Sequence, residues 1–279
     1  MKSLKKQMDA TDLPCGSVAI WSLGQSGVII KGSKDDGAIC IDPYLTDCIE
    51  KNKPGTEFVR AFPAPFAPEE LSALDGVIIT HEHDDHLDPC TLKGIAKTAK
   101  AAKFAVPPAH RHLLPERIGE ERIIAACQNQ RFSIGGFRIT PIAVAHDTYV
   151  FDADGNAEHL GYLIEGNGVK LFHSGDTIVD EKIVETVAAF APDIVFLPIN
   201  GGDYARTRRG IIGNMNFREA CDFSDCVQAD MLIPIHFDLF PNNTDNPAYF
   251  VDYLFHTYPN QKFHMMVAGE RFVYFSSRY

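Results

Sequence analysis

The sequence predicts a single α/β domain, spanning residues 1–279, in which helices pack outside stacked β-sheets. Short apolar runs rich in β-branched residues recur along the chain, bounded by Gly, Asp, Pro or Asn as strands usually are. Stretches of helical periodicity lie between these runs. Because no linker, low-complexity tract or repeat of fixed period interrupts the chain, we expect its layers to form one domain.

The predicted strands are apolar throughout, a pattern typical of strands that are covered on both faces. They span residues 18–21, 28–30, 38–41, 77–79, 137–139, 169–172, 194–197 and 232–235. Helices are predicted over residues 89–99, 180–190, 216–229 and 247–258. Pro89 suits the first turn of its helix, and Asn216 can cap another. Residues 46–70, rich in Pro, Lys and Phe, are predicted to form a long loop, and such loops are often functional.

The composition excludes some classes of partner. The formal net charge is -11, and an acidic surface repels phosphate backbones, so we expect no nucleic-acid partner. Seven scattered cysteines without a C-x-x-C pair indicate reduced thiols in a cytosolic protein. No apolar run is long enough for a signal peptide or a membrane helix, so we expect a cytoplasmic protein without a membrane partner. The sequence leaves open whether the protein forms a homo-oligomer.

A run of metal-ligand side chains follows one of the predicted strands. His81-Glu82-His83-Asp84-Asp85-His86 begins soon after the strand at 77–79 ends. Imidazole nitrogens and carboxylate oxygens are the ligands that hold Zn, Mn and Fe ions. The first two histidines, two residues apart, can point the same way from an extended segment, while the last two residues can turn toward a second ion. The alternative is an acidic, histidine-containing loop in solvent.

Three further candidate ligands, His146, Asp176 and His236, lie at the ends of other strands. A lone histidine at a strand end is more often a hydrogen-bonded structural residue. Four separate strand ends that each offer a ligand favour one converging site, because ligands of layered α/β proteins bind at one end of the strands. His173, three residues before Asp176, is expected behind the ligands, where it would donate a hydrogen bond near the metals.

The order of these residues resembles the metallo-β-lactamase superfamily, and the resemblance runs from about residue 17 to about residue 275. It implies a four-layer αββα sandwich with two metals at one edge of the sheets. The ligands of one metal would be His81, His83 and His146. The ligands of the other would be Asp85, His86 and His236. Asp176 would bridge the two metals, and Asp42 would support the site from behind.

The chain is more closely similar to the L-ascorbate-6-phosphate lactonase branch of that superfamily. The matching segments are 20–27, 80–88, 173–176, 209–211, 214–215 and 233–238. This branch implies a carboxylic ester hydrolase that opens a small anionic lactone, carrying a sugar phosphate or a carboxylate, by attack of metal-bound hydroxide. It implies one or two divalent ions, Mn²⁺ or Zn²⁺ first and Fe as an alternative. Asp85 would then be both a ligand and the acid/base residue that orients the water.

A basic segment offers a binding site for such an anion. Residues 200–210 follow a buried strand and hold three arginines in an otherwise acidic protein. Guanidinium groups match phosphate and carboxylate oxygens, so we expect substrate contacts from Arg209, Arg206 and Tyr204. The alternative is a charged loop in solvent. Among the other histidines, His110 is expected on a surface loop and His159 is expected to be structural.

Three other functions stay open for this sequence. Two metals also suit a phosphodiesterase or nuclease on the same scaffold, although the net charge disfavours long nucleic acids. Iron in the same ligands would suit a redox enzyme, which normally needs a further cofactor module. A binding protein that has lost catalysis is disfavoured by the complete set of seven candidate ligands.

Overall fold

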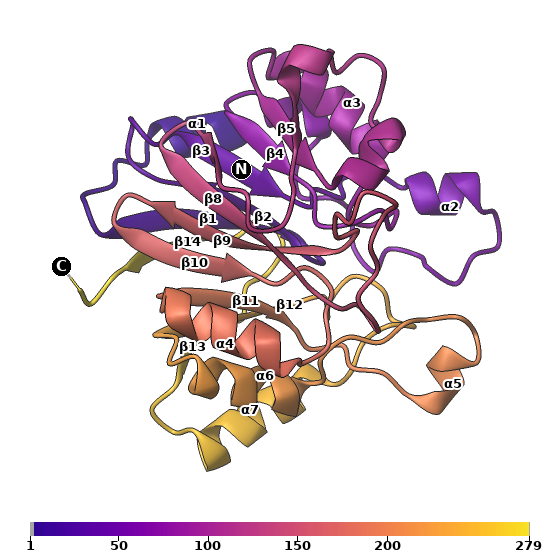
Figure 1. Ribbon diagram of the computed structural model, residues 1–279, viewed down its shortest axis with the longest axis vertical. Coiled ribbons are helices and arrows are strands. Elements are labelled where there is room, and N and C mark those ends of the chain that lie inside the picture. The colour runs from indigo at the N-terminus through magenta and orange to yellow at the C-terminus, as the bar shows by residue number, and fades with distance from the viewer. Residues whose placement is uncertain (1–2, 279) are drawn as a thin grey trace.

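Two seven-stranded mixed sheets stack face to face in the computed structural model, which describes residues 3–278 (Figure 1). The strands of the first sheet follow the order β14 (Arg271–Phe275), β1 (Ser17–Gly24), β2 (Gly27–Lys31), β3 (Ala38–Ile41), β4 (Gly76–Ile78), β5 (Lys103–Val106) and β6 (Ile123–Ala125). Those of the second follow the order β13 (Lys262–Phe263), β12 (Met231–Ile235), β11 (Ile194–Pro198), β10 (Val169–His173), β9 (Leu160–Gly166), β8 (Phe137–Ala143) and β7 (Phe132–Ile134).

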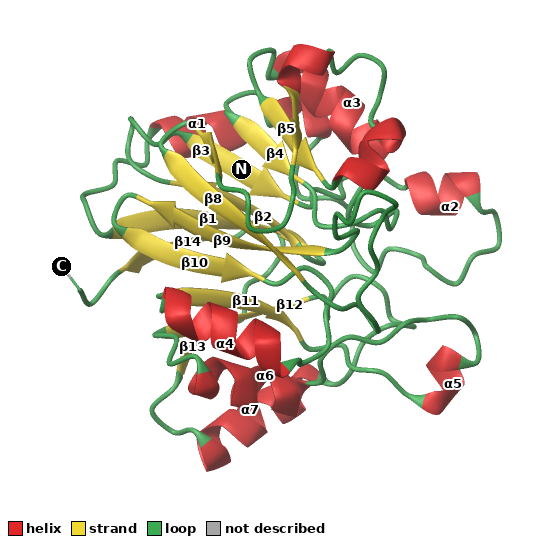
Figure 2. Cartoon of the chain, in the orientation of Figure 1, coloured by secondary structure: helices red, strands yellow, loops and turns green. Residues whose placement is uncertain are grey.

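Helices cover the outer face of each sheet (Figure 2). On the first sheet these are α1 (Leu4–Asp9) and α3 (Pro89–Thr98), whose apolar side chains share one cluster with the strands. On the second they are α4 (Glu181–Phe190), α6 (Phe217–Cys226) and α7 (Pro247–Thr257). The layers therefore run helix, sheet, sheet, helix, which is the αββα sandwich that the resemblance implies.

The wholly apolar sequences of the strands follow from this layering. All eight residues of β1 are buried. Its Val18 and Ile20 face the second sheet, whereas Ala19 and Trp21 belong to the cluster that α1 and α3 cover. Because successive side chains of a strand point to opposite faces, a strand between two layers needs an apolar residue at nearly every position.

The four predicted helices and eight predicted strands are all present, with shifts of a few residues at their ends. Each of these helices begins beside a capping side chain that accepts a hydrogen bond from a backbone N–H of the first turn. The capping residues are Asp88, Asp180, Asn216 and Asn246. Helical periodicity and capping residues thus agree in marking where these helices start.

The carboxyl ends of the parallel strands meet at one edge of the sandwich. Strands β3, β4 and β5 run parallel in the first sheet, as do β10, β11 and β12 in the second. The short helices α2 (Cys48–Asn52) and α5 (Tyr204–Thr207) lie toward the same side, on the right of Figure 1. The prediction that residues 46–70 form only a loop was wrong in part, because α2 is too short to show periodicity in the sequence.

Two further expectations bear on the whole chain. All seven cysteines lie within the described residues and are free thiols, as the sequence predicts. Within residues 3–278, no helix combines the length and the apolar character that crossing a bilayer requires.

Candidate metal centre

The histidine-rich turn follows β4 at the edge where the parallel strands end. It is folded tightly by backbone hydrogen bonds from the N–H groups of His86 and Leu87 to the carbonyl of His83. Asp88 then caps α3 and ends the turn. This geometry brings two imidazoles together, with His81 Nε2 lying 3.0 Å from His83 Nδ1.

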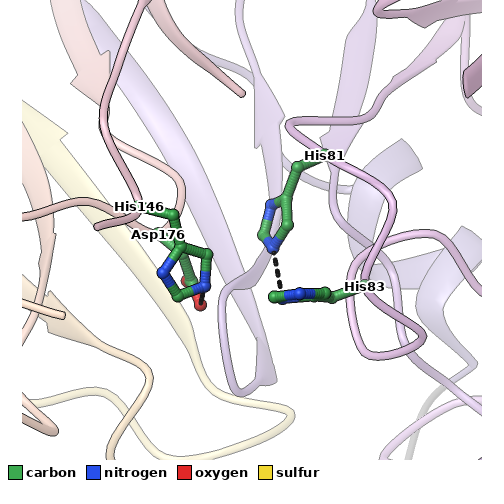
Figure 3. A group of neighbouring side chains, drawn as sticks. All are labelled: His81, His83, His146 and Asp176. Atoms are coloured by element: carbon green, nitrogen blue, oxygen red, sulfur yellow. Dashed lines mark hydrogen bonds and ion pairs between the residues drawn. The ribbon is translucent and has the colours of Figure 1, made fainter. Parts of the chain in front are cut away.

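His146 and Asp176 reach the same point from the second sheet, and Figure 3 shows their side chains facing His81 and His83. Asp176 follows β10 through a turn at Gly175, where φ is +60° and an added Cβ would lie 2.9 Å from a carbon of Thr80, so only glycine fits. His146 Nε2 lies 3.5 Å from Asp176 Oδ2. The potential ligand atoms of this first group, His81, His83, His146 and Asp176, all lie within 4.8 Å of one another.

Asp85, His86 and His236 form a second group, whose potential ligand atoms also lie within 4.8 Å of one another. Asp176 faces both groups: its Oδ1 is 3.3 Å from His86 Nε2, and its Oδ2 is 3.0 Å from His236 Nε2. Asp85 Oδ2 lies 3.6 Å from His236 Nε2. The structure thus brings all seven candidate ligands to one place, and their binding of metal stays a prediction.

Asp42 lies behind the turn, just after β3, and is fully buried. Its Oδ1 accepts the backbone N–H of Thr80, and its Oδ2 accepts the Thr80 hydroxyl and lies 2.8 Å from His86 Nδ1. A carboxylate that holds one ring nitrogen of a histidine fixes the direction of the other nitrogen. Asp42 therefore directs His86 Nε2 toward Asp176.

His173 ties the turn that carries Asp176 to the loop between β1 and β2. The N–H of Gly175 donates to His173 Nδ1, so the ring proton lies on Nε2, which donates to the carbonyl of Ser26 at 2.9 Å. Burial lowers the pKa of His173, which keeps the ring neutral in this role. Its contacts are those of a residue that positions Asp176.

The seven side chains fit a divalent cation. His86 Nε2 and Asp176 Oδ1 are buried, contact each other at 3.3 Å and make no hydrogen bond to any other group, so both atoms are available to a cation. Burial, together with the neighbouring His86 and His83, holds the pKa of His81 well below its ordinary value, so this imidazole is in the neutral form that binds metals. Ligand atoms about 2.1 Å from a tetrahedral ion lie about 3.4 Å apart, near the spacings of 3.0 and 3.5 Å in the first group.

Two histidines outside the predicted ligand set border this centre. His110 was expected on a surface loop, but it is buried and its Nε2 lies 3.1 Å from Glu82 Oε2. The prediction was wrong because the 3₁₀ helix Pro108–Leu113 turns this residue inward, toward a partner that no local pattern marks. His159 is also buried, and its ring centroid lies 5.4 Å from that of His81.

Gln25 is a further residue of the site, to which the sequence assigned no role. It lies in the turn between β1 and β2 and is 5% exposed. Its side-chain Nε2 lies 2.8 Å from Asp85 Oδ2 and 3.0 Å from His236 Nε2. The signals in the sequence were its place in the segment 20–27, which matches the lactonase branch, and in a turn after a buried strand that could face the site.

A pocket of about 340 Å³ opens over both groups. Its floor includes His83, Asp85, His146, Asp176 and His236. Apolar side chains from three segments, which follow β3, β11 and β12, form its walls, and these are Ile49, Phe58, Ile211, Ile212 and Phe240. Among the described residues that line it, Lys53 is the one lysine or arginine, and its Nζ pairs with Asp84 at 2.8 Å.

The three residues expected to clamp an anion do not line this pocket. Tyr204 is 78% exposed. Arg206 is buried and donates to the Asp203 carboxylate and to a backbone carbonyl, so its donors are used within the protein. Arg209 lies beside the pocket and pairs with Glu57 at 3.1 Å. The sequence located the basic segment but could not show that these internal partners take up its charges.

Comparison with known proteins identifies the family. Residues 39–237 match the family model described as a beta-lactamase superfamily domain. The chain belongs to the beta-lactamase superfamily. This superfamily member is similar to a UPF0173 metal-dependent hydrolase of Thermococcus onnurineus, with 29% identity over 238 residues that cover 84% of this chain and 90% of the relative.

Solved structures resemble this superfamily member in fold. A possible metal-dependent hydrolase from Veillonella parvula aligns with a TM-score of 0.72 at 15% identity, over 92% of this chain and 99% of the other. The isothiocyanate hydrolase from Delia radicum gut bacteria aligns with a TM-score of 0.69 at 17% identity, over 93% and 100% of the two chains. At these identities the likeness shows the fold alone.

Proposed function

We propose that this superfamily member is a metal-dependent hydrolase that cleaves a small carboxylic ester, most directly a lactone, in the pocket above its histidine and carboxylate centre. The observation that carries the proposal is the Asp176 carboxylate, which faces two groups of potential ligand atoms beneath one pocket. The metal-dependent hydrolase among its relatives supports it. A divalent cation in such a site lowers the pKa of water and polarises a carbonyl oxygen.

Asp85 is the residue that we assign to proton transfer. Burial alone would raise the pKa of its carboxyl group, but the imidazoles of His86 and His236 outweigh burial and hold that pKa well below its usual range. Asp85 is therefore ionised at neutral pH, which is the form that can orient a water molecule and accept its proton. Its place at the pocket floor gives substrate access to this carboxylate.

The pocket supports a substrate with a compact apolar body and one anionic group. Its volume of about 340 Å³ suits a small molecule. The phosphate or carboxylate of an anionic lactone would meet Lys53, which lines the pocket, in preference to Arg206, which does not. A phosphodiester polymer would find no basic surface here, since the described lining residues include one cation and the net charge is -11.

Hydrolysis of a panel of lactones and carboxylic esters, run beside bis(p-nitrophenyl) phosphate, tests the proposal. We expect the metal-loaded protein to turn over at least one lactone or ester, and Asp85→Asn to lower kcat by about 10²- to 10⁴-fold. Asp154→Asn, at an exposed aspartate, is the matched control and should leave kcat unchanged. Turnover of the phosphodiester alone would overturn the substrate assignment, and an unchanged kcat in Asp85→Asn would overturn the role of Asp85.

A further inference from the structure

Gln25 is fastened by its backbone to the strand end that carries His236. Its N–H donates to Asp238 Oδ1 at 2.9 Å, and its carbonyl accepts the N–H of His236 at 2.9 Å. Both Gln25 and His236 have positive φ, 56° and 58°, and the hydrogen bond between them holds the two backbones side by side beneath the second group of ligands. The backbone of Gln25 is therefore anchored on both sides, so its side chain extends from a fixed position next to His236.

The amide of Gln25 lies against the second group of ligands. Its Nε2 is 2.8 Å from Asp85 Oδ2 and 3.0 Å from His236 Nε2, two atoms that are themselves 3.6 Å apart. The ionised carboxylate of Asp85 accepts hydrogen bonds, so the group that faces it must be the amide NH₂ and not the amide oxygen. The same NH₂ also lies 3.0 Å from His236 Nε2, the ring nitrogen that this group would offer to an ion.

We propose that Gln25 sets the metal stoichiometry of this protein by closing the group Asp85, His86 and His236 to a second ion. An ion that enters this group must displace the Gln25 amide from Asp85 and from His236, which are two of the three ligands of the group. The displacement must take place in a buried site where the backbone of Gln25 is anchored. Within residues 3–278, the side chain of Gln25 makes its hydrogen bonds to this group and none to the first group. The chain would therefore hold one ion tightly, among His81, His83, His146 and Asp176.

This assignment gives Asp85 a defined role. With no second ion on its carboxylate, Asp85 is held by a neutral donor that fixes its direction and leaves its charge in place. Such a carboxylate keeps both its charge and its direction, so it can orient a water molecule in the pocket. The inference rests on the metal-binding part of the proposed function and is independent of its substrate.

Metal titration of the full chain, stripped with EDTA and assayed without substrate, tests the inference. Calorimetry with Mn²⁺, and separately with Zn²⁺, gives the affinity of each ion, and elemental analysis after desalting gives the ions retained per chain. We expect the wild-type protein to retain one ion. In Gln25→Ala the second ion should bind about tenfold more tightly or better, because two amide contacts no longer oppose it. In Gln25→Glu it should bind more tightly still, because a carboxylate oxygen replaces the donor.

Gln228→Ala is the matched control. Gln228 has the same positive φ, 55°, but precedes β12 at the end away from His236, and its amide donates to the carbonyl of Asp225. This variant should bind metal as the wild type does, and the affinity for the first ion should be the same in all four proteins. That shared first affinity also shows that the variants are folded at the site.

Three results would overturn the inference. One is a wild-type protein that holds two ions with similar affinity, and another is a second-ion affinity that Gln25→Ala leaves unchanged. The third is a weaker second ion in Gln25→Ala, which would mean that the amide is turned over and its oxygen is a ligand. Failure of every protein to bind even a first ion would instead contradict the proposed function, so the two failures are distinguishable.

Discussion

At the scale of single residues, the centre depends on side chains that hold the ligands as much as on the ligands themselves. Asp42 has φ of 44°, a left-handed conformation that aspartate tolerates better than most residues. From that position it satisfies both Thr80 and His86. The resemblance pointed to Asp42, but its link through Thr80 could not be predicted because it joins residues 38 positions apart.

We expect Asp42→Asn to weaken metal binding by about 10- to 100-fold. The amide cannot offer two charged acceptors, so either Thr80 or His86 loses its partner and the imidazole loses its fixed direction. Competition with a chromophoric chelator measures the change. Asp193→Asn is the control, because Asp193 is equally buried but precedes β11 at the far end of the sheet. Equal metal affinity in Asp42→Asn and the wild type would contradict the role given to Asp42.

The pair formed by His110 and Glu82 makes stability depend on pH. Burial opposes the charge on each group, but each partner outweighs it, so the pKa of Glu82 falls from 4.5 to about 2 and the pKa of His110 rises above 6.5. The contribution of Glu82 to the free energy of unfolding is present above pH 4.5 and is lost as the pH falls toward 2. The contribution of His110 to the free energy of unfolding is complete below pH 6.5 and is lost as the pH rises through the raised pKa of its imidazole. The pair therefore contributes most to stability between pH 4.5 and pH 6.5.

His110→Gln should accordingly destabilise the metal-free protein most near about pH 5.5, and by less near about pH 9. Urea unfolding in EDTA at the two pH values measures the difference in the free energy of unfolding. His112→Gln, at an exposed neighbour, should show no such trend. A loss of stability in His110→Gln that is equal at both pH values would rule out the ion pair.

At the scale of elements, periodicity and capping predicted the helices, whereas some strands carried no comparable local signal. The segment β9 begins and ends with glycine-containing pairs that lower its strand propensity, yet it sits between β8 and β10. The segment β14 pairs with β1 from the opposite end of the chain, with Ser17 opposite Phe275. Such strands are specified by long-range pairing, which a single sequence does not display.

Two of the three segments that wall the pocket are joined by an ion pair between Arg209 and Glu57. Both side chains are partly exposed, so the pair should contribute about 0–1 kcal/mol to stability. Its effect should appear in substrate binding: Arg209→Glu and Glu57→Arg should each raise KM, and the double variant should bring KM back toward the wild-type value. A double variant no better than the single variants would show that the pair does not hold the pocket walls.

At the scale of the whole molecule, topology assembles the centre. Parallel strands in both sheets end at one edge, so residues that follow β3, β4, β10 and β12 meet there although they are far apart in sequence. The sequence could predict this convergence because each candidate ligand follows an apolar run. It could not predict the pocket walls or the contacts of Gln25 with Asp85 and His236, because these depend on how loops from different layers pack together.

Removing the metal should lower the stability of the entire fold. A ligand present at about a thousandfold excess over its Kd stabilises a protein by about 4 kcal/mol, which corresponds to roughly 10 °C in Tm for a domain of this size. EDTA should lower the Tm by an amount of this order, and added Mn²⁺ or Zn²⁺ should restore it. In Asp176→Ala the Tm should not respond to metal. A wild-type Tm that is indifferent to EDTA would contradict a resident ion that stabilises the fold.

The most direct measurement is anomalous X-ray diffraction from crystals of the protein, collected at the absorption edge of the ion that it carries after purification. We expect an anomalous peak at bonding distance from His81, His83, His146 and Asp176. A peak elsewhere on the molecule, with these four side chains left without an ion, would contradict the metal centre on which the proposed hydrolysis depends.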